Sequence, residues 1–320
     1  MKTAVIGLGT IGKLHIAVLE DLQADIVAVC DSDTNKLGAF SRYKGYTDYI
    51  RMIDQEKPSV VHICTPHYLH TEMIIHALER DIHVLCEKPL CIRKEDIPKI
   101  TTAQKKSQAQ LGVCLQNRYN PQNQFIKAFL QDKKVLSATG NLTWRRGARY
   151  YQSAVWRGKW ETEGGGVLIN QALHSLDLLQ YLLGMPQAVC ASVSNLTLQG
   201  VIEVEDSAQL ICYGKENGFV FSATNGGFGA SSITMDIYTE QDHLHICNDG
   251  VIINGELRSF KPTDKEYGKS CYGSGHSALV RDFYDCIRTG RKFAIDAKEG
   301  AKSVQIVLTA YESQGKKREL

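Results

Sequence analysis

Three glycines near the start of the 320-residue sequence restrict its fold more than any other feature. Gly7, Gly9 and Gly12 stand between a short apolar run, residues 3–8, and a stretch in which apolar residues recur at helical spacing. One glycine can make the tight turn out of a strand, a second lets the backbone approach a pyrophosphate, and a third allows close packing of helix on sheet. The pattern therefore predicts a strand–turn–helix unit that binds a dinucleotide at the helix N-terminus.

An acidic residue lies at the position where dinucleotide-binding units contact the adenosine ribose. Asp31 follows Gly12 by 19 residues and ends a second apolar run, residues 25–31. Its carboxylate would accept hydrogen bonds from the adenosine ribose and repel a 2′-phosphate, so we expect NAD rather than NADP. The alternative is a glycine turn of another α/β fold, with Asp31 capping a helix. The cofactor contacts expected in this segment are Gly7, Gly9, Thr10, Ile11, Gly12 and Asp31.

The chain changes its pattern near residue 118. Up to that point, apolar strand-like runs alternate with helical patterns, which is typical of a parallel sheet with helical crossovers. Beyond it, strand-like runs follow one another with turn residues between them, interrupted by a helix near 167–183. We therefore predict an α/β Rossmann domain over 1–118. Residues 119–320 are expected to form an α+β domain for substrate binding and oligomerisation. It would hold a large, mostly antiparallel, open-faced sheet, and its C-terminal helices could pack back on the first domain.

Composition narrows the classes of function. Lys and Arg number 37 against 35 Asp and Glu, so bulk charge does not favour a nucleic-acid partner. No apolar run reaches the roughly 18 residues of a membrane helix, and the N-terminal apolar stretch carries the glycine turn instead of a cleavage site. The ten cysteines form no CxxC pair, and several lie in apolar runs as reduced core thiols do. We expect a cytoplasmic protein without a metal site.

A lysine motif follows the apolar run 83–86 directly: Glu87-Lys88-Pro89. Ligands of open parallel sheets bind at the carboxyl ends of the strands, so a lysine at this place would face cofactor and substrate. Its ammonium can donate to a hydroxyl or carbonyl oxygen, and partial burial can lower its proton affinity. The alternative is a solvated lysine in a turn that ends at the proline.

A third signal lies on the helix that follows three glycines at 164–166. Asn170, His174 and Asp177 are spaced i, i+4 and i+7, so they share one helix face, apart from an apolar stripe. A histidine that titrates near neutral pH suits general-base chemistry on a carbinol. The alternative is a hydrogen-bonded histidine without a part in catalysis.

Together these motifs resemble the Gfo/Idh/MocA oxidoreductase family of glucose–fructose oxidoreductase and inositol 2-dehydrogenase. The resemblance implies hydride transfer between a secondary alcohol carbon of a sugar or cyclitol and C4 of a nicotinamide. It extends along the chain over the glycine turn, Cys64-Thr65-Pro66 with His70, EKP at 87–89, the triple glycine, the helix with Asn170, DFYDCI at 282–287 and YES at 311–313. It adds cofactor contacts at Thr65, Pro66, His70, Glu87, Lys88 and Gln116.

The resemblance also implies roles. Lys88 would be the catalytic lysine and His174 the general acid/base, with Asn170 and Asp177 in the same catalytic set. Asn170 departs from the inositol dehydrogenases, which carry Asp at this place, and is similar to the sugar-nucleotide 3-dehydrogenases, which carry Asn. Because an amide takes no proton, His174 or Lys88 must do so. The alternative functions are an NAD-dependent glycoside hydrolase of the same fold and a non-enzymatic dinucleotide-binding regulator.

Residues 144–160, WRRGARYYQSAVWRGKW, combine all three tryptophans with five cations and no acid. Arginines bind phosphates or carboxylates and aromatic faces stack on sugar rings, so we expect a sugar phosphate, a uronate or a nucleotide sugar. The alternative is a basic loop paired with acids elsewhere, or packed between domains. The family resemblance implies a homodimer or homotetramer through the open sheet face. The expected substrate contacts are Lys88, Arg118, Tyr119, Trp156, Arg157, Asn170, His174 and His276, with Tyr272 a further candidate.

Overall fold

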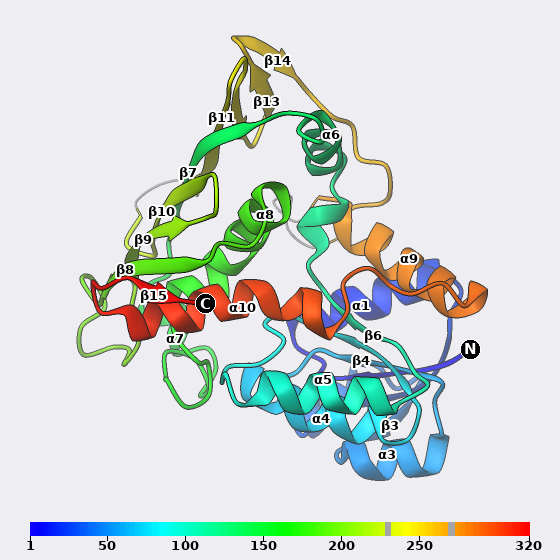
Figure 1. Ribbon diagram of the computed structural model, residues 1–320. Helices are drawn as coiled ribbons and strands as arrows, with labels where there is room; N and C mark the ends of the chain where they lie inside the picture. The colour runs from blue at the N-terminus through cyan, green and yellow to red at the C-terminus, as the bar shows by residue number, and fades with distance from the viewer. Residues whose placement is uncertain (228–231, 268–272) are drawn as a thin grey trace. The chain divides into compact units, whose positions relative to one another are not determined.

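The computed structural model describes residues 1–227, 232–267 and 273–320, and the chain forms two compact units (Figure 1). The first unit comprises residues 1–116 and 264–301, and the second comprises residues 117–263 and 302–320. The chain therefore passes between the units three times, and neither unit is one continuous segment. A division at residue 118 alone does not describe this arrangement, because a later segment joins the first unit.

The first unit is built on a six-stranded sheet with strand order β3-β2-β1-β4-β5-β6. All neighbouring strands are parallel. This is the 3-2-1-4-5-6 order of a doubly wound dinucleotide-binding fold, so the predicted α/β fold of this unit is confirmed. The order reverses at β1, and such sheets bind ligands at the carboxyl ends of the strands beside that point. The strands are β1 (Lys2–Ile6), β2 (Asp25–Cys30), β3 (Lys44–Tyr46), β4 (Val60–Ile63), β5 (His83–Cys86) and β6 (Leu111–Val113).

The central strands of this sheet are continuous apolar runs. Val5, Ile63 and Leu85 have no exposed surface. Parallel strands are usually buried on both faces, which explains why these runs show no alternation of polar and apolar residues. The helices of the unit are α1 (Thr10–Asp21), α2 (Thr34–Gly38), α3 (Tyr49–Glu56), α4 (His70–Leu78), α5 (Asp96–Lys106) and α9 (Gly275–Thr289), and α10 (Ala297–Ser313) begins in it.

Helix α9 belongs to the core of the first unit although it is far away in sequence. Its Phe283 is fully buried and packs against Gly112 of β6. A Cβ atom at position 112 would come within 2.9 Å of the Phe283 ring, so the contact requires glycine. The last strand of the sheet is therefore completed by a helix made some 170 residues later in the chain.

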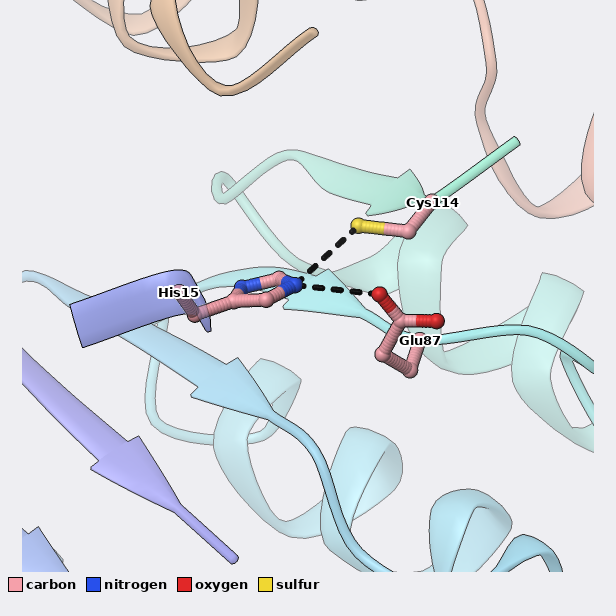
Figure 2. A group of neighbouring side chains, drawn as sticks. All are labelled: His15, Glu87 and Cys114. Atoms are coloured by element: carbon pink, nitrogen blue, oxygen red, sulfur yellow. Dashed lines mark hydrogen bonds and ion pairs between the residues drawn. The ribbon is translucent and has the colours of Figure 1, made fainter. Parts of the chain in front are cut away.

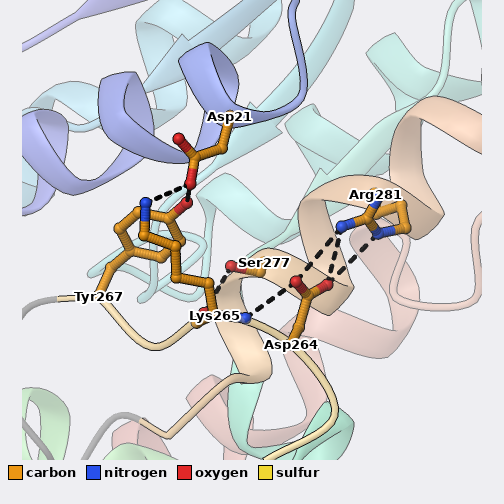
Figure 3. A network of polar contacts seen from close by, with 6 residues as sticks. All are labelled: Asp21, Asp264, Lys265, Tyr267, Ser277 and Arg281. Carbon is orange, nitrogen blue, oxygen red and sulfur yellow. Dashed lines mark hydrogen bonds and ion pairs between the residues drawn. The ribbon is translucent and has the colours of Figure 1, made fainter.

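A polar network ties the segment before α9 to α1 (Figure 3). Lys265 and Tyr267 donate hydrogen bonds to the Asp21 carboxylate, and Arg281 of α9 forms an ion pair with Asp264 at 3.0 Å. The hydrogen bond from Lys265, followed by that from Tyr267, lowers the pKa of the Asp21 carboxyl. These contacts fix the start of α9 against α1 within the same unit.

The second unit contains a nine-stranded sheet with strand order β14-β13-β12-β11-β7-β10-β9-β8-β15. Every neighbouring pair is antiparallel except β10 with β7. The predicted large, mostly antiparallel sheet is therefore confirmed. Its strands are β7 (Val135–Thr143), β8 (Ala188–Ser194), β9 (Ser207–Tyr213), β10 (Gly218–Thr224), β11 (Ser232–Thr239), β12 (His243–Cys247), β13 (Gly250–Ile253), β14 (Glu256–Arg258) and β15 (Arg318–Glu319).

One face of this sheet is covered by helix α8 (Leu173–Leu183), which contacts β7 and β10. Leu179 of α8 and Phe221 of β10 meet over Gly140, where a Cβ would lie 3.1 Å and 2.6 Å from them. Residues of β9 and β10 alternate between buried and exposed, as strands with one covered face do. The unit also holds α6 (Pro121–Phe129) and α7 (Ala148–Tyr151).

The helix expected near 167–183 is not a uniform α-helix. It begins with a π-helical turn, Leu168–Ala172, and continues as α8. A π turn places one more residue in the turn and is often found at functional sites. Asn170 therefore lies in the π turn and His174 in the first turn of α8. Over the described ranges of the chain, no helix is both long and apolar enough to span a membrane.

Candidate functional site

The glycine turn between β1 and α1 needs glycine at two positions for internal reasons. Gly7 has φ +91°, and a Cβ there would lie 2.5 Å from the carbonyl oxygen of Cys64. A Cβ on Gly12 would lie 1.8 Å from the carbonyl oxygen of Gly7. Gly9 is different, because a Cβ there would meet no atom of the described chain within 4 Å. The open space beside Gly9 fits the predicted approach of a pyrophosphate to the backbone.

The N-terminus of α1 is ready to receive an anion. Its N-cap is Gly9, and no side chain caps the first turn. The free N–H groups and the positive end of the helix dipole therefore point toward the space beside the glycine turn. Thr10 is exposed and Ile11 is half-buried at this end of the helix. These residues could hold the diphosphate of a dinucleotide without a charged side chain.

Asp31 links the end of β2 to the glycine turn. Its side chain Oδ2 accepts the N–H of Leu8 at 2.8 Å, and Oδ1 accepts the N–H of Asp33 at 3.0 Å. Lys36 forms an ion pair with the same carboxylate at 3.2 Å. The carboxylate is thus held in place beside the glycine turn, and its contact with an adenosine ribose stays a prediction. The neighbouring Lys36 was not anticipated, and it bears on the choice between NAD and NADP.

Two further predicted cofactor segments are joined by a buried histidine. The ring of His70 places Nε2 2.9 Å from the carbonyl oxygen of Thr65 and Nδ1 2.7 Å from that of Pro89. Burial lowers the pKa of His70. His70 therefore bridges the turn after β4, which includes Pro66, to the turn after β5 that carries Lys88. Its predicted contact with the cofactor stays a prediction, whereas its positioning of the two turns is evident.

Lys88 lies half-buried two residues after the end of β5, next to the buried Glu87. Glu87 Oε2 accepts the N–H of Lys88 at 3.2 Å, and Oε1 lies 3.0 Å from Nε2 of His15 (Figure 2). Burial opposes ionisation of Glu87, but the hydrogen bond from His15 outweighs it, and the pKa of Glu87 falls to about 2. Lys88 is thus placed beside a permanent buried anion.

The buried groups around Glu87 include a set of metal-ligating type. Among the described residues, His15, Glu87 and Cys114 have side-chain ligand atoms within 4.8 Å of one another (Figure 2). The two contacts on His15 Nε2 are 3.0 Å to Glu87 and 3.9 Å to the Cys114 thiol. His276, predicted as a substrate contact, is buried in this unit with its Nε2 3.9 Å from Glu87. Gln116, at the end of the unit, is also buried.

In the second unit, two predicted site residues bind each other. Arg118 forms a bidentate ion pair with Asp177, at 2.8 Å from Nε and 2.7 Å from Nη2, and both side chains are buried. The Arg118 guanidinium also lies over the ring of Tyr181 at 4.6 Å. This pair fixes α8 to the segment after β6. The predicted parts of Arg118 in substrate binding and of Asp177 in catalysis stay predictions, and Tyr119 beside them is half-buried.

Asn170 is held by a carboxylate that the sequence analysis did not single out. Glu163 has no exposed surface, and its two oxygens accept the side-chain N–H of Asn170 and the backbone N–H of Gly158. The same Asn170 amide lies 3.3 Å from the hydroxyl of Tyr150. His174, four residues further along, is half-buried. The Asn170 amide is thus backed by the carboxylate of Glu163.

The basic and aromatic segment meets Asn170 through Tyr150. The guanidinium groups of Arg146 and Arg157 lie 4.6 Å and 4.3 Å from the centre of the Tyr150 ring. Arg157 also lies over Trp156 at 4.6 Å and contacts the Tyr150 hydroxyl. Neither arginine forms an ion pair with an acid within the described part of the chain. The structure therefore does not support the alternative for Arg146 and Arg157, in which distant acids would neutralise the basic loop.

A second unforeseen carboxylate holds the beginning of the π turn. Glu205 is buried and accepts hydrogen bonds from the N–H groups of Gly166 and Leu168, at 2.8 Å and 2.9 Å, and from the Tyr311 hydroxyl at 2.8 Å. Burial raises the pKa of Glu205 to about 7 despite these donors. This packing requires glycine at position 165, because a Cβ there would lie 2.0 Å from the Tyr311 hydroxyl oxygen.

Several residues of this site carry no local signal in the sequence. Glu163 stands directly before the triple glycine and Glu205 in a segment without a motif, and their partners lie 5 to 106 residues away. His15 does stand three residues after the glycine turn, but only its distant partner Glu87 gives it a role. Tyr272 lies outside the described residues.

The geometry defines a class of protein: an α/β unit with a dinucleotide-binding turn, joined to a unit whose open sheet carries a helix with a polar cluster. The chain belongs to the Gfo/Idh/MocA family of oxidoreductases, as its motifs predict. Residues 1–115 match the family described as an oxidoreductase family with an NAD-binding Rossmann fold, and residues 134–244 match the GFO/IDH/MocA C-terminal domain. The first unit is therefore an NAD-binding Rossmann unit.

The chain is similar to several curated proteins of this family. It is 29% identical over 197 residues to D-glucoside 3-dehydrogenase of Escherichia coli, covering 58% of this chain and 55% of that protein. It is 26% identical over 193 residues to inositol 2-dehydrogenase of Salmonella typhimurium, covering 57% and 54%. With the rhizopine catabolism protein MocA of Rhizobium meliloti, the alignment is 24% identical and covers 97% and 94%. In the first two alignments the chain spans about half the length of the relative.

Solved structures show the same fold over the whole chain. The WlbA dehydrogenase from Chromobacterium violaceum, in complex with NADH and UDP-GlcNAcA, has a TM-score of 0.90 at 28% identity, covering 100% of this chain and 96% of that one. The WlbA dehydrogenase from Bordetella pertussis, with the same two ligands, has a TM-score of 0.89 at 26% identity, covering 100% and 98%. Levoglucosan dehydrogenase, with a TM-score of 0.85 at 21% identity, supports the fold alone.

Proposed function

We propose that this protein is an NAD-dependent dehydrogenase that oxidises a secondary alcohol of a sugar or cyclitol derivative with a negatively charged group. The observation that carries the proposal is the cluster around Asn170 in the second unit. Glu163 and Tyr150 hold its amide, and Arg146 and Arg157 flank the Tyr150 ring without an acidic partner among the described residues. An amide beside an aromatic ring and two guanidinium groups without an acidic partner among the described residues suits a hydroxylated, anionic ligand.

The reaction needs one hydride acceptor and one proton acceptor. NAD supplies the chemistry of hydride acceptance at C4 of its nicotinamide, and family membership supports NAD as the cofactor. Lys88 is proposed to donate a hydrogen bond to the substrate oxygen, and His174 to take the hydroxyl proton. Asn170 can orient the hydroxyl by a hydrogen bond, but its amide does not act as an acid or a base. One alcohol and one NAD thus give one carbonyl, one NADH and one proton.

The anionic part of the substrate is proposed to be a phosphate, a uronate carboxylate or a nucleotide diphosphate. Arg157 and Trp156 stack on each other at 4.6 Å and offer a charged and an aromatic face side by side. The two WlbA dehydrogenases were crystallised with UDP-GlcNAcA, which carries both a diphosphate and a uronate. The ligand of these two relatives supports testing nucleotide sugars first, and sugar phosphates and uronates in the same experiment.

The test is a substrate panel with two optical readouts. The purified protein is incubated with NAD and UDP-sugars, UDP-uronates, sugar phosphates, inositols and neutral sugars, and NADH absorbance is followed. Parallel samples contain nitrophenyl glycosides, and the Lys88→Ala variant serves as the control for each positive. NADH formation with an anionic sugar supports the proposal. Nitrophenol release without net NADH would move the assignment to a glycoside hydrolase. Tight NAD binding without any turnover would favour the regulator.

We also propose that two copies associate through the open face of the nine-stranded sheet. Ile211 and Val220 stand opposite each other on β9 and β10, and each exposes over 40% of its surface. Tyr213 and Tyr238 extend the same face and are 36% and 39% exposed. Light scattering after gel filtration tests this: the native protein should be a dimer or tetramer, and Val220→Lys should shift it toward the monomer.

A cytoplasmic location is proposed from the state of the thiols. The nine cysteines in the described part of the chain are all free, and most are buried. Free buried thiols are typical of a reducing compartment. Cell fractionation with an antibody against the native protein tests the location, and recovery in a secreted or periplasmic fraction would contradict it.

A further inference from the structure

A line of hydrogen bonds runs through the first unit from the buried Glu87 to the first strand. Glu87 Oε1 contacts His15 Nε2 at 3.0 Å, and His15 Nδ1 contacts His62 Nδ1 at 2.7 Å. His62 Nε2 contacts the Tyr284 hydroxyl at 3.0 Å, which contacts the Thr3 hydroxyl at 2.9 Å. Thr3 then donates to the carbonyl oxygen of Met1 at 3.2 Å. Figure 2 shows the inner end of this line.

Hydrogen counting shows that these five contacts depend on one another. A carboxylate only accepts, so His15 Nε2 must carry a hydrogen when Glu87 is ionised. If His15 carries no other hydrogen, His62 must donate from Nδ1, and its Nε2 must accept from Tyr284. Tyr284 can then only accept from Thr3, which leaves the Met1 carbonyl without its donor. This arrangement fills four of the five contacts.

One additional proton reverses the direction of the line. With hydrogens on both nitrogens, His15 donates to His62 Nδ1, and His62 donates from Nε2 to the Tyr284 oxygen. Tyr284 then donates to Thr3, and Thr3 donates to the Met1 carbonyl. All five contacts are filled. The geometry therefore favours the protonated form by one hydrogen bond. Between His15 and Thr3, donor and acceptor exchange roles in every contact when the extra proton is added.

The charged groups around His15 indicate where this proton resides. His15 faces Glu87 from the end of β5, His62 from β4, the Cys114 thiol from the end of β6 and His276 from α9. Burial lowers the pKa of His62 well below its usual value and that of His276 to about 4, so both are neutral. The hydrogen bond from His15 holds the pKa of Glu87 low, so the Glu87 carboxylate is the acceptor in its contact with His15.

We propose that Glu87, His15, His62, Tyr284 and Thr3 form one proton-holding line, whose single mobile proton sets the net charge of the buried pair beside Lys88. With the proton in place, the pair is an imidazolium and a carboxylate with no net charge. When it is lost, the His15 Nδ1 hydrogen passes to His62, the His62 Nε2 hydrogen to Tyr284, and one proton leaves to water at the Tyr284–Thr3 end.

The consequence for catalysis rests on the proposed function. A bare Glu87 carboxylate next to Lys88 would favour the ammonium form of that lysine, whereas a neutral pair would not. His15, His62 and Tyr284 are thus positioning residues, because they act on the substrate only through Glu87 and Lys88. Tyr284 is half-buried, so the line leads from the enclosed Glu87 toward the surface of the unit.

The first experiment reads the hydrogens directly and needs no turnover. Histidine nitrogens of the 15N-labelled full-length protein are observed by NMR from pH 6 to 9, with signals assigned through His15→Asn and His62→Asn. At pH 7 we expect hydrogens on both His15 nitrogens and on Nε2 alone of His62. A neutral His15, or a His62 protonated at Nδ1 while His15 is still charged, would overturn the proposal. So would stoichiometric zinc in elemental analysis, which would make His15, Glu87 and Cys114 a metal site instead.

Isosteric variants provide the second readout. Tyr284→Phe and Thr3→Val each remove the one hydrogen bond by which the protonated line is favoured, so His15 should lose its Nδ1 hydrogen about one pH unit lower in both. Tyr43→Phe is the matched control, because Tyr43 is also half-buried and donates to a carboxylate, that of Glu20, outside the line. An unchanged midpoint in both variants would contradict the hydrogen count.

The kinetic readout separates this inference from the proposed function. In Tyr284→Phe the pH midpoint of kcat should move by the same one unit, while the KM for NAD and the melting temperature stay close to those of the Tyr43→Phe control. If the NMR midpoint moves and the kcat midpoint does not, the line exists but does not act on Lys88. If the native protein turns over no substrate, the proposed function fails, and the NMR result still decides whether the line holds a proton.

Discussion

Replacing Glu205 with glutamine should change how the stability of the second unit depends on pH. The Glu205 side chain is buried at the start of the π turn that carries Asn170, with three donors around its two oxygens. Glutamine has the same shape but does not ionise between pH 5 and 8. The variant therefore removes one titrating group and leaves every other ionisable group in the protein unchanged.

The magnitude follows from the pKa of this carboxyl. Burial raises it from 4.5 to about 7 in the folded protein. Between these two values the unfolded chain is ionised and the folded protein is not, so the folded state holds one more proton and stability falls as the pH rises. At about 1.4 kcal/mol per pH unit, the loss is roughly 3 kcal/mol in total, most of it between pH 5 and 8. The glutamine variant lacks this loss.

The assay is urea unfolding followed by tryptophan fluorescence at pH 5, 6, 7 and 8. All three tryptophans lie between residues 144 and 160, so the signal reports on the second unit. The free energy of unfolding of the native protein, relative to that of the variant, should fall by roughly 2–3 kcal/mol from pH 5 to pH 8, mostly below pH 7. Parallel curves would refute the reasoning, because they would mean that Glu205 is ionised in the fold throughout this range.

Three further predictions concern the first unit. Asp31→Ala should weaken NAD binding more than NADP binding, because Lys36 loses its carboxylate partner and can meet a 2′-phosphate; calorimetric titration with both cofactors checks this. Gly9→Ala should keep the native melting temperature but lose NAD affinity, whereas Gly12→Ala should lower the melting temperature, since only the second Cβ collides with the chain. Lys88→Ala should reduce kcat about 10²- to 10⁴-fold with an almost unchanged dissociation constant for NAD; similar turnover would remove Lys88 from the mechanism.

The fold of the first unit could be predicted because its signals are local. The glycine turn, the apolar runs and the spacing to Asp31 all lie within short windows of sequence, and a parallel sheet requires buried strands whatever their order. The open sheet of the second unit was equally visible from consecutive strand-like runs. The π turn at Leu168–Ala172 was not, because its residues have the same apolar spacing as the start of an α-helix.

The candidate site divides in the same way. Lys88, Asn170 and His174 could be singled out because each stands in a recognisable motif. Their partners could not, since hydrogen bonds between Asn170 and Tyr150, or between His15 and Glu87, join residues 20 and 72 positions apart. A sequence states which groups are present at a site, but the pairing of buried groups is decided by tertiary packing. This is why Glu163 and Glu205, the acids that hold Asn170 and the π turn, were found only in the structure.

Segments of the two units alternate along the chain, and this order affects folding during synthesis on the ribosome. Residues 1–116 lack α9, which supplies Phe283 to their core, until residue 301 has been made. That is 185 residues later, or about 10–40 s at usual elongation rates. Throughout this interval the nascent chain exposes an unfinished apolar surface at β6. We therefore expect the first unit to mature slowly, or to need a chaperone that covers this surface, until residues 264–301 have been synthesised.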